Sequence, residues 1–137
     1  METDILNTLV TGAIWRAEHL EARGIRPAQA WAEVSSLEEE LAKVLPAAEA
    51  EGRIARRGAV RAALKAGDCP RAHLLSDSYL ADKAAPTSLK TALRKILEDD
   101  DQAMTSHFRY AAKHHSLREA RDLARRFREA GAFGLAA

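Results

Sequence analysis

The stretch AVRAALKAGDCPRAHLLSDSYL, residues 59–80, decides the fold class of this chain. Before its central turn, apolar residues recur at helical spacing among alanines, which are strong helix formers. Gly67 can end this first helix in the left-handed conformation, because it has no Cβ to clash. Asp68 is suited to cap a second helix, and Pro70 fits the first turn of that helix, where a missing N–H costs nothing.

After the turn, Ala72, Leu75 and Tyr79 form an apolar stripe, which Leu74 and Leu80 widen. Two apolar stripes joined by so short a turn pack antiparallel. The pattern ALxAGDxxRAxxLxxxYL resembles a joint between helices of tetratricopeptide-like arrays. No period near about 34 residues recurs elsewhere, and the Trp and Gly-Tyr positions of such repeats are missing. We therefore interpret the stretch as a generic αα-hairpin, which implies no particular function.

The composition extends the helical prediction to the whole chain. Its 137 residues fit one domain with a real core. Apolar residues make up 47% and aromatic residues only 5%, so the core is built from Leu, Ala, Ile and Val. No stretch alternates apolar and polar residues long enough for a convincing strand. We predict an all-α fold, a single compact bundle of six to seven short helices with αα-hairpins.

The same periodicity divides the single domain, residues 1–137. We expect an acidic N-terminal helical pair over residues 1–45, helical hairpins over 46–130 and a tail over 131–137. Within this scheme we expect four helices before residue 83: one at 4–23, a second that begins at Pro27, a third at 47–66 and a fourth at 70–82. We expect three more after it: one from Thr87 or Ser88 to about Asp99, one from Asp100 or Asp101 to His115, and one from Ser116 to Gly131. Thr3 or Asp4 would cap the helix at 4–23.

Three features predict helix boundaries inside these segments. Pro46 either kinks a long helix or starts a new one, because a proline ring clashes with the preceding turn. Gly52 and Gly58 indicate either close approach of a neighbouring helix or a break near Gly52, since each glycine costs about 1 kcal/mol in a helix interior. The acidic run at residues 98–101 opposes the macrodipole at a helix C-terminus and favours an N-terminus. We therefore expect a boundary near Asp99.

The net charge is +1, but the charge is distributed in blocks. Residues 1–52 carry four basic and ten acidic side chains, whereas residues 53–75 carry six basic and one acidic. Residues 76–105 carry four basic and six acidic side chains, and residues 106–137 carry seven basic and three acidic. In one interpretation acidic helices pack near basic helices and the blocks complement each other. In the other, the basic helix faces join in one surface.

Such a basic surface could neutralise several phosphates of DNA or RNA. Against this, no Asn or Gln stands among the arginines to recognise adenine, and stacking aromatics are nearly absent there. The residues of this alternative lie on the faces 53–71 and 109–128: Arg53, Arg57, Arg61, Lys65, Arg118, Arg121, Arg125 and Arg128.

The two N-terminal helices carry the chain's two tryptophans and a heptad-like seam from Val34 to Ala48. Trp15 lies beside the apolar stripe of its helix, so it either packs against a neighbouring helix at the edge of the stripe or is an exposed anchor for a partner. We predict that the following residues mediate a protein–protein interaction: Trp15, Trp31, Val34, Leu37 and Leu41.

Residues typical of catalysis or metal binding do not converge in the sequence. His107, Tyr110 and His114 share a helix face and His115 adjoins them, but their spacing matches no known metal signature. Cys69 is a single cysteine and is interpreted as a small turn residue. We find no phosphate loop or nucleophile motif. We therefore expect no cofactor, no metal and no enzymatic activity.

The N-terminus lacks a signal-peptide pattern, and no apolar run reaches the length of a membrane span. We expect a cytoplasmic protein, and the Ala- and Arg-rich composition suggests a bacterial source. The leading hypothesis is a small non-catalytic adaptor or regulator that contacts another protein, or a second copy of itself, through its N-terminal helices. The alternative is a DNA- or RNA-binding regulator that uses the basic faces, and no membrane partner is expected.

Overall fold

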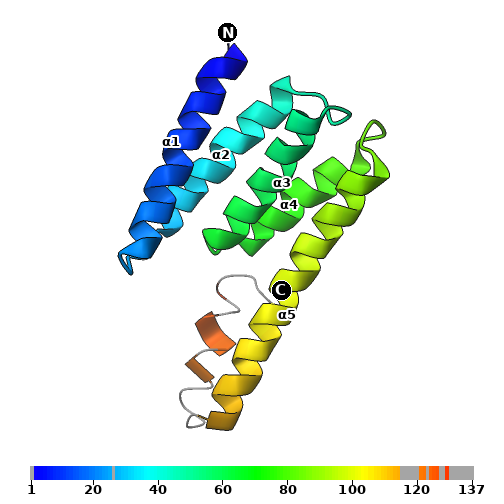
Figure 1. Cartoon of the computed structure of the whole chain (residues 1–137). Coiled ribbons are helices and arrows are strands. Elements are labelled where there is room, and N and C mark those ends of the chain that lie inside the picture. The colour runs from blue at the N-terminus through cyan, green and yellow to red at the C-terminus, as the bar shows by residue number, and fades with distance from the viewer. Residues whose placement is uncertain (1, 26, 115–120, 123, 127–128, 130–137) are drawn as a thin grey trace.

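The computed structural model describes residues 2–25, 27–114, 121–122, 124–126 and 129, and the regular structure in these residues is helical. Figure 1 shows five successive helices along the chain. They are α1 (Glu2–Ala22), α2 (Ala28–Val44), α3 (Ala50–Lys65), α4 (Cys69–Ala81) and α5 (Thr87–His114). The prediction of a compact all-α bundle is confirmed.

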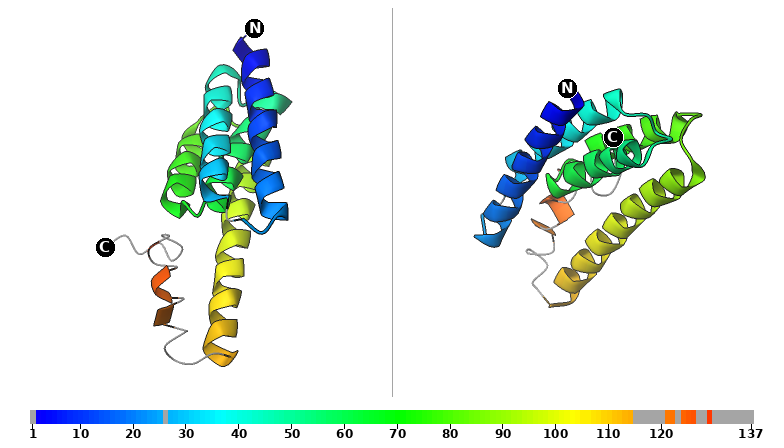
Figure 2. Two further views of the ribbon diagram at one scale, coloured as in Figure 1. Left: turned by 90° about the vertical axis from the view of Figure 1, so that its left-hand side faces the viewer. Right: turned by 45° about the horizontal axis from the view of Figure 1, so that its top comes forward.

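Each of the first four helices packs on the next, and α5 packs on both α3 and α4. Figure 1 and the right-hand view of Figure 2 place α1 and α5 at opposite edges of the array, with α3 between them. Among the described helices, the backbones of α1 and α3 do not come close to each other, nor do those of α2 and α4. Each of these pairs is separated by a helix that contacts both partners. This geometry leaves room for grooves, whose floors are α2 and α3.

Small side chains allow this close packing. Ala17, Ala55, Ala59 and Ala63 are completely buried. Burial of small residues brings helix backbones close together, and the larger Val60, Leu89 and Leu93 then fill the space among α3, α4 and α5. A second group packs α1 and α2 onto α3: Ala13, Ala17, Trp31, Val34 and Ala62.

The hairpin predicted at residues 59–80 is present. Gly67 has φ +78°, and its neighbour Asp68 donates its backbone N–H to the Ala63 carbonyl at 2.9 Å. The Asp68 carboxylate accepts a hydrogen bond from the Arg71 backbone N–H at 3.0 Å and so caps α4. Leu74 is the exception, because its side chain is 73% exposed and does not widen the core stripe.

Pro46 lies in the connection between α2 and α3, so a new helix begins after it rather than a kinked one continuing. Both glycines of α3 mark close approaches, and the alternative of a break near Gly52 is wrong. A Cβ at Gly52 would overlap the Pro46 carbonyl oxygen. A Cβ at Gly58 would lie 2.6 Å from Oε1 of Glu38 on α2.

The predicted boundary near Asp99 is wrong, because α5 continues without a break from Thr87 to His114. The macrodipole acts only within the first and last turns of a helix, and the acidic run lies well inside α5. The carboxylates there have local partners instead. Asp99 lies 3.8 Å from the Lys95 ammonium, and Asp100 approaches Cys69 of α4.

Three smaller expectations are also corrected. Helix α1 already begins at Glu2, so neither Thr3 nor Asp4 is its cap. The helical spacing of apolar residues in that helix predicts a core stripe that includes Leu9, but Leu9 is 49% exposed. The heptad-like seam of α2 ends at Leu41, since Val44 is 41% exposed. The helix expected from Ser116 and the tail lie largely outside the described residues.

Candidate protein-interaction surfaces

Three of the predicted interaction residues are buried within the chain. Trp31, Val34 and Leu41 are each at most 4% exposed, and they pack between α1 and α3. The Trp31 indole donates a hydrogen bond to Glu21 at 2.8 Å, and the Lys65 ammonium lies 4.2 Å from the centre of its ring. These side chains stabilise the packing of the N-terminal helices, and their direct contact with a partner stays a prediction.

Trp15 is 66% exposed on the outward face of α1. Its ring stacks on His19, with 5.3 Å between ring centroids and 8° between planes. The expectation that it packs against a neighbouring helix is therefore wrong. Its alternative role as an exposed anchor stays a prediction, and half-buried Leu37 completes the predicted interaction set.

The predicted basic face of α3 is not uniformly exposed. Arg53 donates a hydrogen bond to the Ala48 carbonyl, and Arg57 is half-buried. Arg61 and Lys65 are exposed. Of the C-terminal set, Arg118 and Arg128 lie outside the described residues. Arg121 and Arg125 are exposed, and Arg125 lies 3.5 Å from Asp122.

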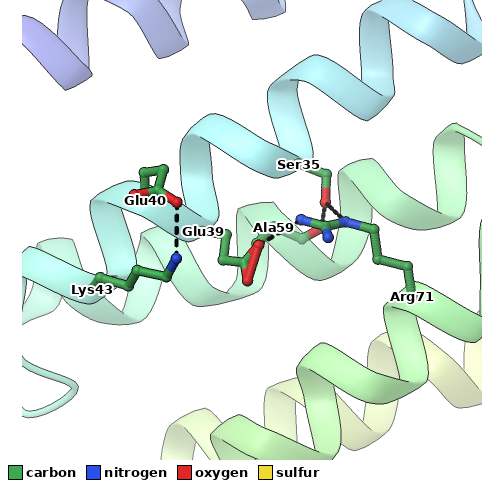
Figure 3. A network of polar contacts seen from close by, with 6 residues as sticks. All are labelled: Ser35, Glu39, Glu40, Lys43, Ala59 and Arg71. Atoms are coloured by element: carbon green, nitrogen blue, oxygen red, sulfur yellow. Dashed lines mark hydrogen bonds and ion pairs between the residues drawn. The ribbon is translucent and has the colours of Figure 1, made fainter.

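One groove runs between α2 and α4, with α3 below it. It consists of two adjoining hollows of about 530 and 420 Å³, which share Glu39, Leu75 and Ser78. Arg71 of α4 bridges the groove (Figure 3). Its Nε donates to Ser35 Oγ at 3.0 Å, and its Nη2 donates to Glu39 at 2.8 Å. The bridge holds α4 at a fixed distance from α2.

The network continues into the core. Ser35 is fully buried and donates its hydroxyl to the Ala59 carbonyl of α3 at 2.8 Å (Figure 3). A single arginine therefore connects three helices through one serine. Since Ser35 lies outside the apolar seam of its helix, the sequence alone favours a solvated position for it, and no periodicity in the chain identifies the contact with Arg71.

Arg56 lies at the other end of this groove and is only 8% exposed. Its Nη1 donates to the carbonyls of Leu45 and Gly52, both at 2.9 Å. Its guanidinium lies 5.6 Å from the centre of the Tyr79 ring. Burial, followed by the charge of nearby Glu39, raises the pKa of Tyr79 to about 12. These groups serve the packing of α3 and α4, and the tyrosine stays neutral.

A second groove runs between α1 and α3, with α2 as its floor. Its volume is about 490 Å³. The lining residues are Asn7, Val10, Thr11, Ile14, Glu38, Leu41, Glu51, Ile54 and Ala55. Ile54 is 56% exposed at the edge. The lining combines five apolar side chains with two carboxylates, and it contains no basic side chain.

Glu38 is the unusual residue of this α1–α3 groove. It is 6% exposed, and its carboxyl group has no hydrogen bond or ion pair with any of the described residues. The carboxyl group lies against Gly58, where the missing side chain makes room for it. Loss of hydration disfavours the charged form and raises the pKa of Glu38 to about 7.

Side chains of the types used in catalysis and metal binding are also present in the described part of the chain. The described residues contain no cluster of three His, Cys, Asp or Glu side chains that could hold a metal ion, and His115 lies outside them. Cys69 is 2% exposed, and its Sγ lies 3.9 Å from Asp100. Burial, with the Asp100 charge second, raises the pKa of its thiol to about 11. A thiol of this kind is a poor nucleophile at neutral pH.

Within the described part of the chain, none of the helices is long and apolar enough to cross a membrane. Comparison with known protein families, with curated proteins and with solved structures finds no match. Inference about function must therefore start from the grooves and faces described above.

Proposed function

We propose that this chain is a small non-catalytic adaptor or regulator of the bacterial cytoplasm that binds a protein partner through its N-terminal helices. The observation that supports it best is the α1–α3 groove. Two helices form its walls and a third its floor, most of its lining is apolar, and Ile54 remains exposed at its edge. Grooves of this construction accept the apolar face of an amphipathic helix.

The buried residues of α2 support this proposal indirectly. Trp31, Val34 and Leu41 fix α1 against α2 and α2 against α3, so the groove is largely formed before a partner arrives. A preformed groove reduces the entropy lost on binding. Substitution of Trp31 would test folding rather than recognition, because that side chain is buried.

Recognition is tested by substitution at the edge of the groove. A displayed library of helical peptides is selected on the full-length chain, and the enriched peptides are measured on Ile54→Glu. Burial of an isoleucine contributes about 2 kcal/mol, so we expect affinity to fall by at least tenfold. Leu74→Glu is the matched control, since Leu74 is also exposed and lies on α4. If no peptide is enriched, or if both variants bind equally well, the groove is not a recognition site.

A nucleic-acid-binding regulator is the second candidate, and the exposure of Arg61 on α3 favours it. Arg61 forms no ion pair with a described carboxylate. The half-buried Arg53 and Arg57 leave fewer free cations on that face than the sequence suggested. Fluorescence anisotropy with duplex DNA at two salt concentrations tests this candidate, because phosphate binding weakens steeply with salt. Absence of binding at low salt would exclude it.

A further inference from the structure

Glu38 and Gly58 together carry two local costs to stability. A glycine in a helix interior is less favourable than alanine, and α3 accepts it at the point where the Glu38 carboxyl lies. A buried carboxylate without a partner is also unfavourable. Features that destabilise the free protein in this way are expected at functional sites, where a ligand supplies the missing interaction.

The surroundings of the carboxyl group define which ligand fits. From α3, Glu51 lines the same groove, and from α1 the polar lining residues are the uncharged Asn7 and Thr11. From α4, Tyr79 is close enough for the Glu38 charge to raise its pKa slightly. Arg56 of α3 lines the other groove, where its guanidinium donates to backbone carbonyls. The groove therefore has an excess of negative charge and an apolar edge.

We propose that Glu38 is the specificity-determining residue of the α1–α3 groove, and that it receives one lysine or arginine side chain from an amphipathic helix of a protein partner. The cation would complete the interaction that Glu38 lacks, while apolar side chains of the same helix would cover Ile14 and Ile54. This inference rests on the proposed function, because it names what the same groove recognises.

Recognition of a cation requires the ionised carboxylate, so binding is linked to loss of a proton from Glu38. With a pKa of about 7, roughly a tenth of the carboxyl groups are ionised at about pH 6 and roughly nine tenths at about pH 8. We therefore expect the affinity for the partner helix to rise about tenfold over this interval. The Glu38→Gln variant should lose this pH dependence.

The test uses the groove-dependent peptides from the selection described above, with the full-length chain. We expect every such peptide to carry a Lys or Arg that contacts Glu38. Replacement of this residue by norleucine should weaken binding to the wild type at least tenfold. The same replacement should leave binding to Glu38→Gln unchanged. Glu40→Gln is the control, because Glu40 is exposed on the same helix and does not line the groove. If Glu38→Gln does not fold, the norleucine comparison and the pH dependence on the wild type decide the matter.

The possible failures can be told apart. One failure is a set of peptides that are sensitive to Ile54→Glu and yet need no cation. Another is a set of peptides that bind Glu38→Gln as well as they bind the wild type. Either result would overturn the role of Glu38 and leave the proposed function standing. If no peptide depends on Ile54, both proposals are wrong. Sedimentation velocity that shows self-association abolished by Ile54→Glu would identify a second copy as the occupant and refute a basic partner helix.

Discussion

Replacement of Glu38 by glutamine should make the folded state more stable at high pH, because the uncharged amide has nearly the shape of the carboxyl group. In the folded chain the Glu38 pKa is about 7, against an ordinary value of 4.5. The folded state therefore holds the proton more tightly than the unfolded state does. The stabilisation of the folded state by the bound proton is fully present below about pH 4.5 and is lost as the pH rises through about 7.

The two pKa values determine the size of the effect. Above about pH 8 the ionised carboxyl costs the folded state about 3 kcal/mol relative to the neutral form. Most of this cost develops between about pH 5 and pH 8, where linkage gives a change of roughly 2 to 3 kcal/mol. Since the chain has other titrating groups, the quantity to compare is the difference in unfolding free energy between wild type and Glu38→Gln at each pH.

Urea unfolding followed by circular dichroism measures this difference. We expect Glu38→Gln to gain roughly 2 to 3 kcal/mol on the wild type between about pH 5 and pH 8, with half of this gain reached near about pH 6 and a plateau above about pH 7. Glu40→Gln is the control, because Glu40 is exposed on the same helix and should show no such trend. Parallel stability curves for wild type and Glu38→Gln would refute a desolvated, unpaired carboxyl group and, with it, the reason to expect a cation there.

Three further predictions concern the glycines and the cysteine. Gly58→Ala should stabilise the chain by up to about 1 kcal/mol in a Glu38→Ala background. In the presence of Glu38 this gain should be lost, because the new Cβ would meet the Glu38 carboxyl group. A double-mutant cycle measured by urea unfolding tests this coupling. Gly52→Ala should lower the stability of the fold by more than about 2 kcal/mol, because the new Cβ would overlap a backbone oxygen. Gly12→Ala should be neutral or stabilising, because only the tip of an arginine side chain lies within reach of its Cβ. Thermal unfolding of both variants measures the difference. Cys69 should react with a thiol reagent at about pH 8 only in denaturant, and fast labelling of the native chain would contradict its burial and raised pKa.

Much of the fold could be predicted from the sequence, because local rules act where the structure is local. The turn at residues 66–70 combines a glycine, a capping aspartate and a proline in the order that two helices need. The apolar spacing at 3 and 4 residues predicted the helices around it. The acidic run in α5 shows the limit of such rules. A charge pattern predicts a boundary only when it lies at a helix end, and the length of α5 depends on its packing against α3 and α4.

The candidate site was harder to predict, because its parts come from separate helices. Trp31 was predicted to mediate a protein–protein interaction, but the sequence cannot say whether so large an apolar residue faces a partner or, as the structure has it, packs inside the chain. Since Glu38 lies outside the apolar seam of its helix, the sequence alone favours a solvated position for it. The one usable signal was Gly58. A glycine inside a helix implied a close approach, although not that a carboxyl group would be the neighbour.

The two grooves differ in a way that bears on function. In the groove between α2 and α4, Arg71 is already paired with Glu39 and Ser35, so its charge is satisfied within the chain. In the α1–α3 groove the corresponding charge, Glu38, has no partner within the described chain. A paired charge mainly maintains the arrangement of helices, whereas an unpaired buried charge gains more from a ligand of opposite sign. For that reason we assign recognition to the α1–α3 groove, although the groove bridged by Arg71 is the larger of the two.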